Sequence, residues 1–207
     1  MKKFLLTVLV ISACAISINA QTKGTNALGF GVSSQKSETD WNGDENNYSQ
    51  TEKRTQSYYS LTYARFIKDN TRLGMTGSVS RGKQEYSNSA YKSNGYGVEI
   101  NYQKYYPLLK KFYAFAGGRA STFHENFSNT GEFSESGSSQ QYGVGAMGGA
   151  AYFLSKRFAF EAQLLSADFI YFESRNAGNH SDRNQSSFHA STSGFINDLS
   201  FKIYLLF

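Results

Sequence analysis

Apolar and polar residues alternate one by one along most of this chain. In the clearest example Tyr96, Val98 and Ile100 fall on one face of an extended segment, whereas Glu99 and Asn101 fall on the other. Successive side chains of a β-strand point to opposite faces. The pattern therefore predicts an all-β protein in which each strand has one apolar and one polar face.

Eight such strands are predicted, and helical periodicity is nearly absent. The alternation slips once, at Leu164-Leu165, which predicts a β-bulge in the seventh strand. The predicted strands lie near residues 26–35, 57–67, 73–79, 96–103, 112–124, 142–152, 158–171 and 199–207.

The connections between the predicted strands alternate strictly in length. The short ones are residues 68–71, 107–111 and 155–157, and the long ones are residues 37–55, 81–94, 125–139 and 173–187. Transmembrane β-barrels have short periplasmic turns, long external loops and an even number of strands. The alternation therefore predicts a closed antiparallel barrel with both ends of the mature chain in the periplasm.

Composition and charge are consistent with this prediction. Aromatic residues make up 16% of the chain, which has 19 Gly and 1 Pro. The mean hydropathy of −0.48 does not exclude a barrel, because strands with one lipid face and one lumen face average to polar. The formal charge of +5 includes two lysines near the N-terminus, and further cations sit in short turns, so a nucleic-acid surface is not predicted. The turn cations are Lys68, Arg72, Lys110, Lys111, Lys156 and Arg157.

The N-terminus carries a secretory signal. Lys2 and Lys3 precede an apolar stretch that ends near Ala20, and this stretch is too short for a permanent membrane helix. The prediction is a cleaved signal peptide at residues 1–20 and one barrel domain at residues 21–207. Cleavage and lipidation at Cys14 is the alternative, because the residues before Cys14 are similar to a lipoprotein processing box.

The last strand carries the most specific motif, a terminal aromatic residue with apolar residues at every second position before it. The motif resembles the C-terminal sorting signal of bacterial outer-membrane barrels. With the strand pattern, it makes residues 26–207 similar to the small outer-membrane β-barrel superfamily that includes OmpX-like and OmpA-like barrels. The motif residues are Leu199, Phe201, Ile203, Leu205 and Phe207.

That resemblance implies an eight-stranded antiparallel up-and-down transmembrane β-barrel in the outer membrane of a Gram-negative bacterium, after a cleaved signal peptide. It implies a monomer whose partners are outer-membrane lipid, lipopolysaccharide and, through the last strand, the barrel-assembly machinery. No cofactor, metal or nucleic acid is implied.

The interior of an eight-stranded barrel is just wide enough for its own side chains to fill. The polar strand faces predict an inward charge network of Glu99, Arg119, Glu161 and Lys202, in which Arg119 reaches Glu99. Because an unpaired buried charge is costly, we expect these groups to pair and plug the lumen. A narrow pore lined by the same groups, passing small solutes, is the alternative.

Catalytic and metal-binding motifs are weak. His189 and Ser191 resemble the His-x-Ser of lipid A deacylase barrels, but no suitable acidic residue follows them, so we expect no enzyme. Residues 40–45 contain alternating oxygen ligands with the glycine misplaced for a calcium loop, and we predict no metal. The long connections are rich in Ser, Asn, Gly and Tyr, a composition that suits a structural, interaction or adhesion role.

Overall fold

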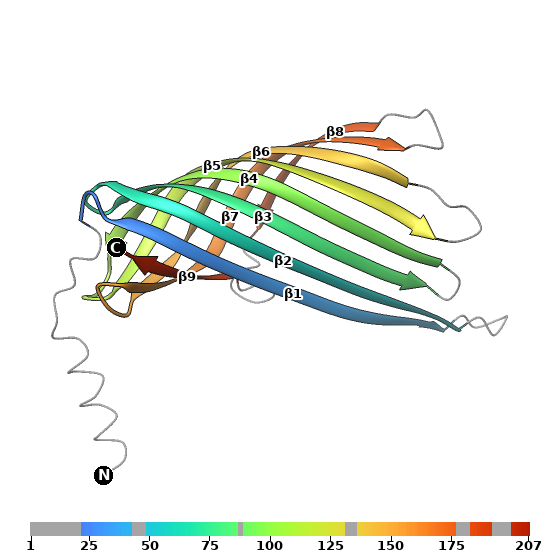
Figure 1. Cartoon of the computed structure of the whole chain (residues 1–207), viewed down its shortest axis with the longest axis horizontal. Coiled ribbons are helices and arrows are strands. Elements are labelled where there is room, and N and C mark those ends of the chain that lie inside the picture. The colour runs from blue at the N-terminus through green and yellow to red at the C-terminus, as the bar shows by residue number, and fades with distance from the viewer. Residues whose placement is uncertain (1–21, 43–48, 87–88, 131–135, 177–182, 192–199) are drawn as a thin grey trace, which may run out of the picture.

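A computed structural model describes residues 22–42, 49–86, 89–130, 136–176, 183–191 and 200–207. These residues form long antiparallel strands that wrap into a barrel (Figure 1). No helix in these ranges is long and apolar enough to cross a membrane. The strands are β1 (Asn26–Asn42), β2 (Ser49–Lys68), β3 (Thr71–Tyr86), β4 (Ser89–Pro107), β5 (Phe112–Thr130), β6 (Ser136–Phe153), β7 (Phe158–Asn176), β8 (Arg183–Ser191) and β9 (Ser200–Leu206).

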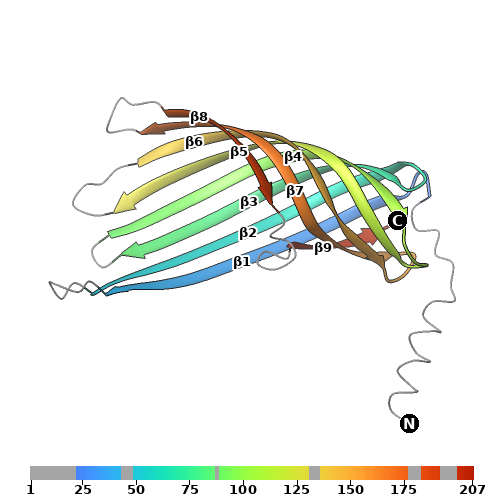
Figure 2. The same ribbon diagram turned by 180° about the vertical axis from the view of Figure 1, so that it is seen from behind.

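The strand pairings close a ring at one end of the barrel, where β1 pairs with β9 from Ala27 to Gly31. Beyond Gly31, the described residues of β1 pair with β2 alone. β1 to β7 each pair with the next strand in sequence, and β9 pairs with both β7 and β1. β8 and β9 occupy the same, eighth position, because β8 pairs with the second half of β7 and β9 with its first half. Figure 2 shows the two segments following one another along β7. The predicted all-β, eight-stranded antiparallel up-and-down architecture is confirmed.

The eighth position is not one regular strand. β7 pairs with β9 from Phe158 to Gln163 and with β8 from Ser166 to Ser174. Only two residues of β7 separate the two pairings, whereas residues 192–199 separate β8 from β9. Leu199 of the predicted sorting motif, the signal peptide and Cys14 lie outside the described residues.

The two ends of the barrel differ as the connection lengths predicted. We call the end with the short connections the turn end and the opposite end the loop end. The turn end holds residues 69–70, 108–111 and 154–157, and the chain enters and leaves the barrel there: the Asn26 N–H donates to Phe207 O over 2.8 Å and the Phe207 N–H donates to Asn26 O over 3.0 Å.

The predicted long loops are largely strand, which corrects the predicted strand ends. Pairing between β1 and β2 continues from Lys36, opposite Thr55, to Asn42, opposite Ser49. Backbone hydrogen bonding does not need an apolar face, so the strands continue where the alternation of side chains stops. A strand of 19 residues, such as β4, spans about 60 Å along its own direction. That exceeds the roughly 25 Å apolar band of such barrels even at a tilt of about 40°.

The predicted β-bulge is confirmed. In the pairing of β6 with β7, Gly148 lies opposite Leu165 and Gly149 lies opposite Gln163, so Leu164 is the extra residue. The bulge restores the outward face beyond it. Phe160 before the bulge and Phe169 after it are both exposed.

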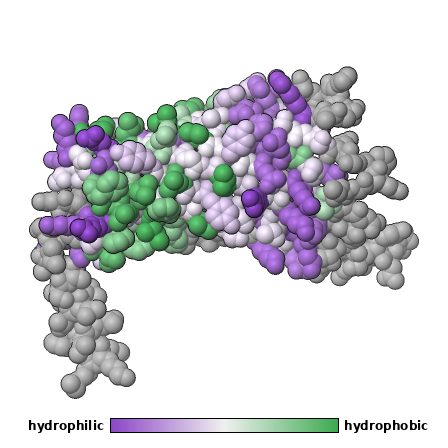
Figure 3. All heavy atoms as spheres, viewed as in Figure 1, coloured by the Kyte–Doolittle hydropathy of each residue, from purple (hydrophilic) through white to green (hydrophobic). Residues whose placement is uncertain are grey.

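Large apolar side chains cover the outside of the barrel near the turn end. Phe30 is 54% exposed and Ile100 is 55% exposed, although soluble proteins rarely expose apolar patches of this extent. Figure 3 shows hydrophobic residues gathered over the turn-end half and hydrophilic residues over the loop-end half. We call this surface the apolar belt; it includes Phe30, Val32, Leu61, Met75, Val79, Val98, Ile100, Val144, Phe160, Leu165, Phe169, Phe201 and Ile203.

Close strand packing at Gly117 provides a test of the fold. A Cβ atom at Gly117 would lie 2.0 Å from the backbone oxygen of Tyr102 on β4, whereas a Cβ at the exposed Gly77 would meet nothing within 4 Å. We expect Gly117→Ala to lower the free energy of unfolding by about 1–3 kcal/mol, because the backbone must shift. In urea this corresponds to a midpoint lower by about 1 M.

Gly77→Ala is the matched control, and its urea midpoint should equal or slightly exceed that of the wild type, since alanine loses less entropy on folding than glycine. Equal midpoints for the two variants would contradict the strand register described here.

Candidate functional site in the barrel lumen

A buried ion pair crosses the lumen near the turn end. Arg72 at the start of β3 meets Glu161 on β7 through two contacts, Nη1 to Oε1 at 2.8 Å and Nη2 to Oε2 at 2.9 Å. The side chains are only 2% and 5% exposed. A guanidinium and a carboxylate in this forked arrangement form the strongest type of side-chain hydrogen bonding in proteins.

Polar and aromatic groups complete the surroundings of this pair. The Tyr105 hydroxyl donates to Glu161, and Arg72 also donates to Gln103 and, over 3.3 Å, to the Tyr204 hydroxyl. The guanidinium carbon lies 4.3 Å from the centre of the Tyr204 ring and 5.5 Å from that of Tyr105. We call these five residues the turn-end layer.

The apolar core of the protein surrounds the turn-end layer. Tyr105 packs against Phe66, Phe115 and Phe153, with ring centres 5.8 to 6.1 Å apart. These three phenylalanines are at most 4% exposed. Side chains therefore fill the lumen at this height, as expected for an eight-stranded barrel.

A second ion-pair cluster lies on β4, β5 and β7, further toward the loop end. Arg119 donates from Nε to Asp168 Oδ1 over 2.8 Å and from Nη2 to Asp168 Oδ2 over 2.6 Å. Its Nη1 lies 3.7 Å from Glu99 Oε2, and the Asn101 amide donates to Glu99 Oε1 over 3.1 Å. The side chains of Glu99, Arg119 and Asp168 are 12–22% exposed, so this middle layer is more open to solvent than the turn-end layer.

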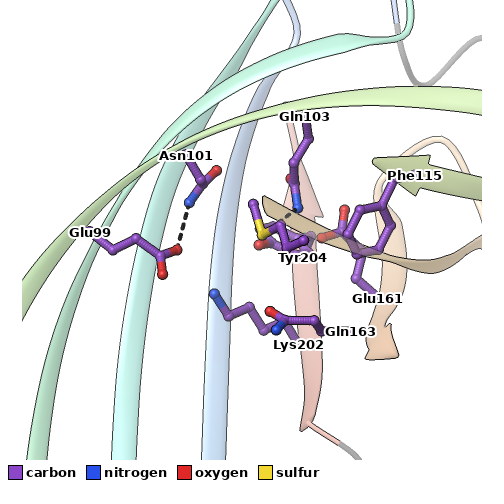
Figure 4. Close-up of a pocket in the computed structure, with 9 residues that line it drawn as sticks. Glu99, Asn101, Gln103, Phe115, Glu161, Gln163, Lys202 and Tyr204 are labelled. Carbon is purple, nitrogen blue, oxygen red and sulfur yellow. Dashed lines mark hydrogen bonds between the residues drawn. The ribbon is translucent and has the colours of Figure 1, made fainter. Parts of the chain in front are cut away.

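Lys202 lies between the two layers. With Glu99, Glu161 and Gln163 it lines a cavity of about 20 Å³ (Figure 4). A water molecule needs roughly 10–15 Å³ of such space, so this cavity has room for about one. In the described part of the chain Lys202 forms no ion pair with a carboxylate.

The lumen is wider toward the loop end. A cavity of about 200 Å³ adjoins the middle layer and is lined by Tyr58, Arg119, Phe123 and Asp168, among others. Another of about 150 Å³ is lined by Arg54 and Glu125, among others. The narrow 20 Å³ cavity lies on the turn-end side of these spaces. The lumen is therefore filled by side chains near the turn end and widens toward the loop end.

The structure brings the four predicted network residues into the lumen, with Glu99 and Arg119 in the middle layer, Glu161 in the turn-end layer and Lys202 between the two. Arg119 reaches Glu99, as predicted, and Glu161 pairs with Arg72 instead of Arg119 or Lys202. The placement of Arg72 among the solvent-facing turn cations is wrong. Its side chain points inward because it shares the parity of the buried Thr76.

Arg72 and Asp168 were not predicted as lumen groups, although the alternation of apolar and polar residues indicates an inward side chain at both positions. In β3 the inward positions are Gly74, Thr76 and Ser78, and one more step toward the turn end reaches Arg72. In β7 the exposed Phe169 points outward, so its neighbour Asp168 must point inward.

The weak catalytic and metal motifs gain no support from the geometry. His189 on β8 pairs with Asp168, and Phe188 pairs with Phe169. Directly paired residues share a face of the sheet, so His189 is on the lumen side and Phe188 faces outward, contrary to the outer-leaflet placement that the deacylase motif requires. Among the described residues no group of His, Cys, Asp and Glu is arranged to hold a metal. Residues 43–45 of the calcium motif lie outside the described residues.

Comparison with solved structures finds bacterial β-barrels. The chain is similar to the translocator domain of the autotransporter NalP from Neisseria meningitidis (TM-score 0.47, 11% identity), covering 89% of this chain and 66% of that domain. It is also similar to Neisserial surface protein A (TM-score 0.48, 12% identity, 89% and 98% covered). A major outer membrane protein from Thermus thermophilus gives a TM-score of 0.45 at 10% identity, with 89% and 99% covered.

No protein-family model matches the chain. The comparison of its sequence with curated proteins finds no match either.

Proposed function

We propose that this chain is an integral outer-membrane β-barrel whose lumen is closed by its own side chains. Its role is structural or interactive, of an adhesion type, and not catalytic. The closed turn-end layer carries this proposal, because the Arg72 and Tyr204 residues inside the barrel are each only 1% exposed. A side-chain-filled lumen leaves the outer surface and the loop end as the parts that meet partners.

The apolar belt supports the membrane placement. A transmembrane barrel needs an outward apolar band about 25 Å tall, and the apolar belt, which includes the exposed Phe30, Ile100 and Phe201, supplies outward apolar residues of this kind. The short connections and both barrel termini lie at one end, which in such barrels is the periplasmic end. The exposed Phe201, Ile203, Leu205 and Phe207 then form the lipid-facing signal that the barrel-assembly machinery reads.

The strand extensions beyond the belt support the interactive role. β1 to β4 continue well past their last large apolar outward residues, Val32, Tyr59, Val79 and Tyr96, with mostly polar residues. Extended strands that are paired with their neighbours hold polar side chains at fixed positions away from the membrane. Such a rigid surface suits binding of lipid headgroups or of molecules outside the cell.

A narrow porin is the second candidate, favoured by the 200 Å³ and 150 Å³ cavities at the loop end. Conductance of the purified protein in a planar lipid bilayer separates the two functions. A closed lumen predicts a baseline without steady channels at any applied voltage that the bilayer tolerates. Large, steady channels in the wild type would refute the closed lumen and favour the porin.

A further inference from the structure

Basic residues gather on the outer face of β1, β3 and β4, beyond the apolar belt. Lys83 on β3 lies directly opposite Lys92 on β4 and, on its other side, opposite Thr55 on β2. Lys36 on β1 pairs with the same Thr55. Arg81 is two residues from Lys83 and therefore points to the same face. All four cations are exposed; we call them the cation patch.

The cation patch begins directly where the apolar belt ends. Val32, Tyr59, Val79 and Tyr96 form one continuous row of paired, outward and exposed residues across β1 to β4. Arg81 is the next outward residue after Val79. Each of the three lysines is the second outward residue beyond the row on its own strand. Two residues of a strand span about 6.6 Å and four span about 13 Å, so Arg81 lies beside the row and the lysines lie about 13 Å from it along their tilted strands. The patch is therefore at the height of the headgroups of lipids that cover the belt.

Carboxylates neutralise only part of this positive charge. Lys53 pairs with Glu38 at 2.9 Å, and Lys83 pairs with Glu85. Within the ranges that the structure describes, Lys36, Arg81 and Lys92 form no ion pair. Three cations are thus available to an external anion on this face. On the opposite side of the barrel the corresponding outward charges, Glu173 and Arg175 on β7, offset one another.

We propose that the cation patch binds the phosphate groups of a phosphorylated glycolipid of the outer leaflet, with the acyl chains of that lipid on the row from Val32 to Tyr96. Arginine and lysine are the side chains that bind phosphate oxygens most strongly. An amphiphile with an anionic head satisfies both the cations and the apolar row beside them, whereas a soluble anion satisfies only the cations. The inference rests on the proposed membrane placement and adds the lipid class and its site.

Native mass spectrometry of the refolded full barrel tests the proposal. The probes are diphosphoryl lipid A and the same lipid with both phosphates removed. The wild type should bind the phosphorylated lipid more tightly. A variant with Lys36→Gln, Arg81→Gln, Lys83→Gln and Lys92→Gln should lose at least about tenfold of that affinity, since each cation near an anionic surface contributes about fivefold. Its affinity for the dephosphorylated lipid should not change.

The control variant removes four cations at the turn end instead: Lys68→Gln, Lys110→Gln, Lys156→Gln and Arg157→Gln. It should keep the preference for the phosphorylated lipid. Equal losses in both variants, no preference in the wild type, or displacement of the lipid by inorganic phosphate alone would each overturn the proposal. Because folding of every variant is checked by heat-dependent gel mobility, a failed lipid preference in a folded barrel overturns this inference and not the barrel itself.

Discussion

Glu161→Ala should lower the free energy of unfolding by about 3–5 kcal/mol, because it leaves Arg72 charged and unpaired in the lumen. Arg72 is 1% exposed, and both of its Nη atoms contact the Glu161 carboxylate. Removal of the carboxylate also takes away the acceptor of the Tyr105 hydroxyl. The measurement is the fraction of folded, fast-migrating protein on an unheated gel as urea is increased. At a typical dependence on urea, the midpoint should fall by about 2 M.

The double variant Arg72→Met with Glu161→Met is the matched control. It removes both charges at once and fills the space with flexible apolar side chains, so its midpoint should return close to that of the wild type. If Glu161→Ala were as stable as the wild type, Arg72 would have to be hydrated, and the lumen would not be closed at this height.

Removal of the turn-end layer should open the barrel to ions. In a variant with Arg72, Glu161, Tyr105 and Tyr204 all changed to serine, the two charges leave together and no unpaired charge remains in this layer. The space that these side chains fill would join the wider cavities toward the loop end. Steady single channels in a planar bilayer, absent from the wild type, are the expected result.

The control for this experiment is a triple serine variant of the middle layer, at Glu99, Arg119 and Asp168. Those residues adjoin a cavity of about 200 Å³, whereas the turn-end layer remains intact. The control should therefore fold and show no steady channels in the planar bilayer. Steady channels in the control, or no channels in a folded turn-end variant, would show that the turn-end layer is not what closes the lumen.

Side-chain parity made most of this lumen predictable from the sequence. Alternation alone placed Glu99, Glu161 and Lys202 on the inner faces of three different strands, and one break in it located the bulge at Leu164. These features depend only on the two-residue period of a strand, which is visible in the order of apolar and polar residues within one segment.

The pairing of the charges depends on the register between strands and on the closure of the barrel. Neither can be read from the sequence of a single strand. Arg72 meets Glu161 across the lumen from a position 89 residues away in sequence. Arg72 lies beside a short turn and was therefore grouped with the turn cations. The two-residue period of β3, continued from Gly74 to Arg72, indicates that its side chain points inward. Strand ends were equally hidden, because backbone pairing continues from Lys36 onward without any apolar signal.

The most direct test of the proposed function is the gel mobility of the protein recovered from the outer-membrane fraction, with and without boiling in SDS. The ring of paired strands at the turn end, where β9 joins β1 to β7, leaves no free edge there from which detergent can open the barrel. We therefore expect the protein in the outer-membrane fraction, with a mobility that changes on boiling. Recovery from a soluble fraction with the same mobility before and after boiling would contradict the transmembrane barrel.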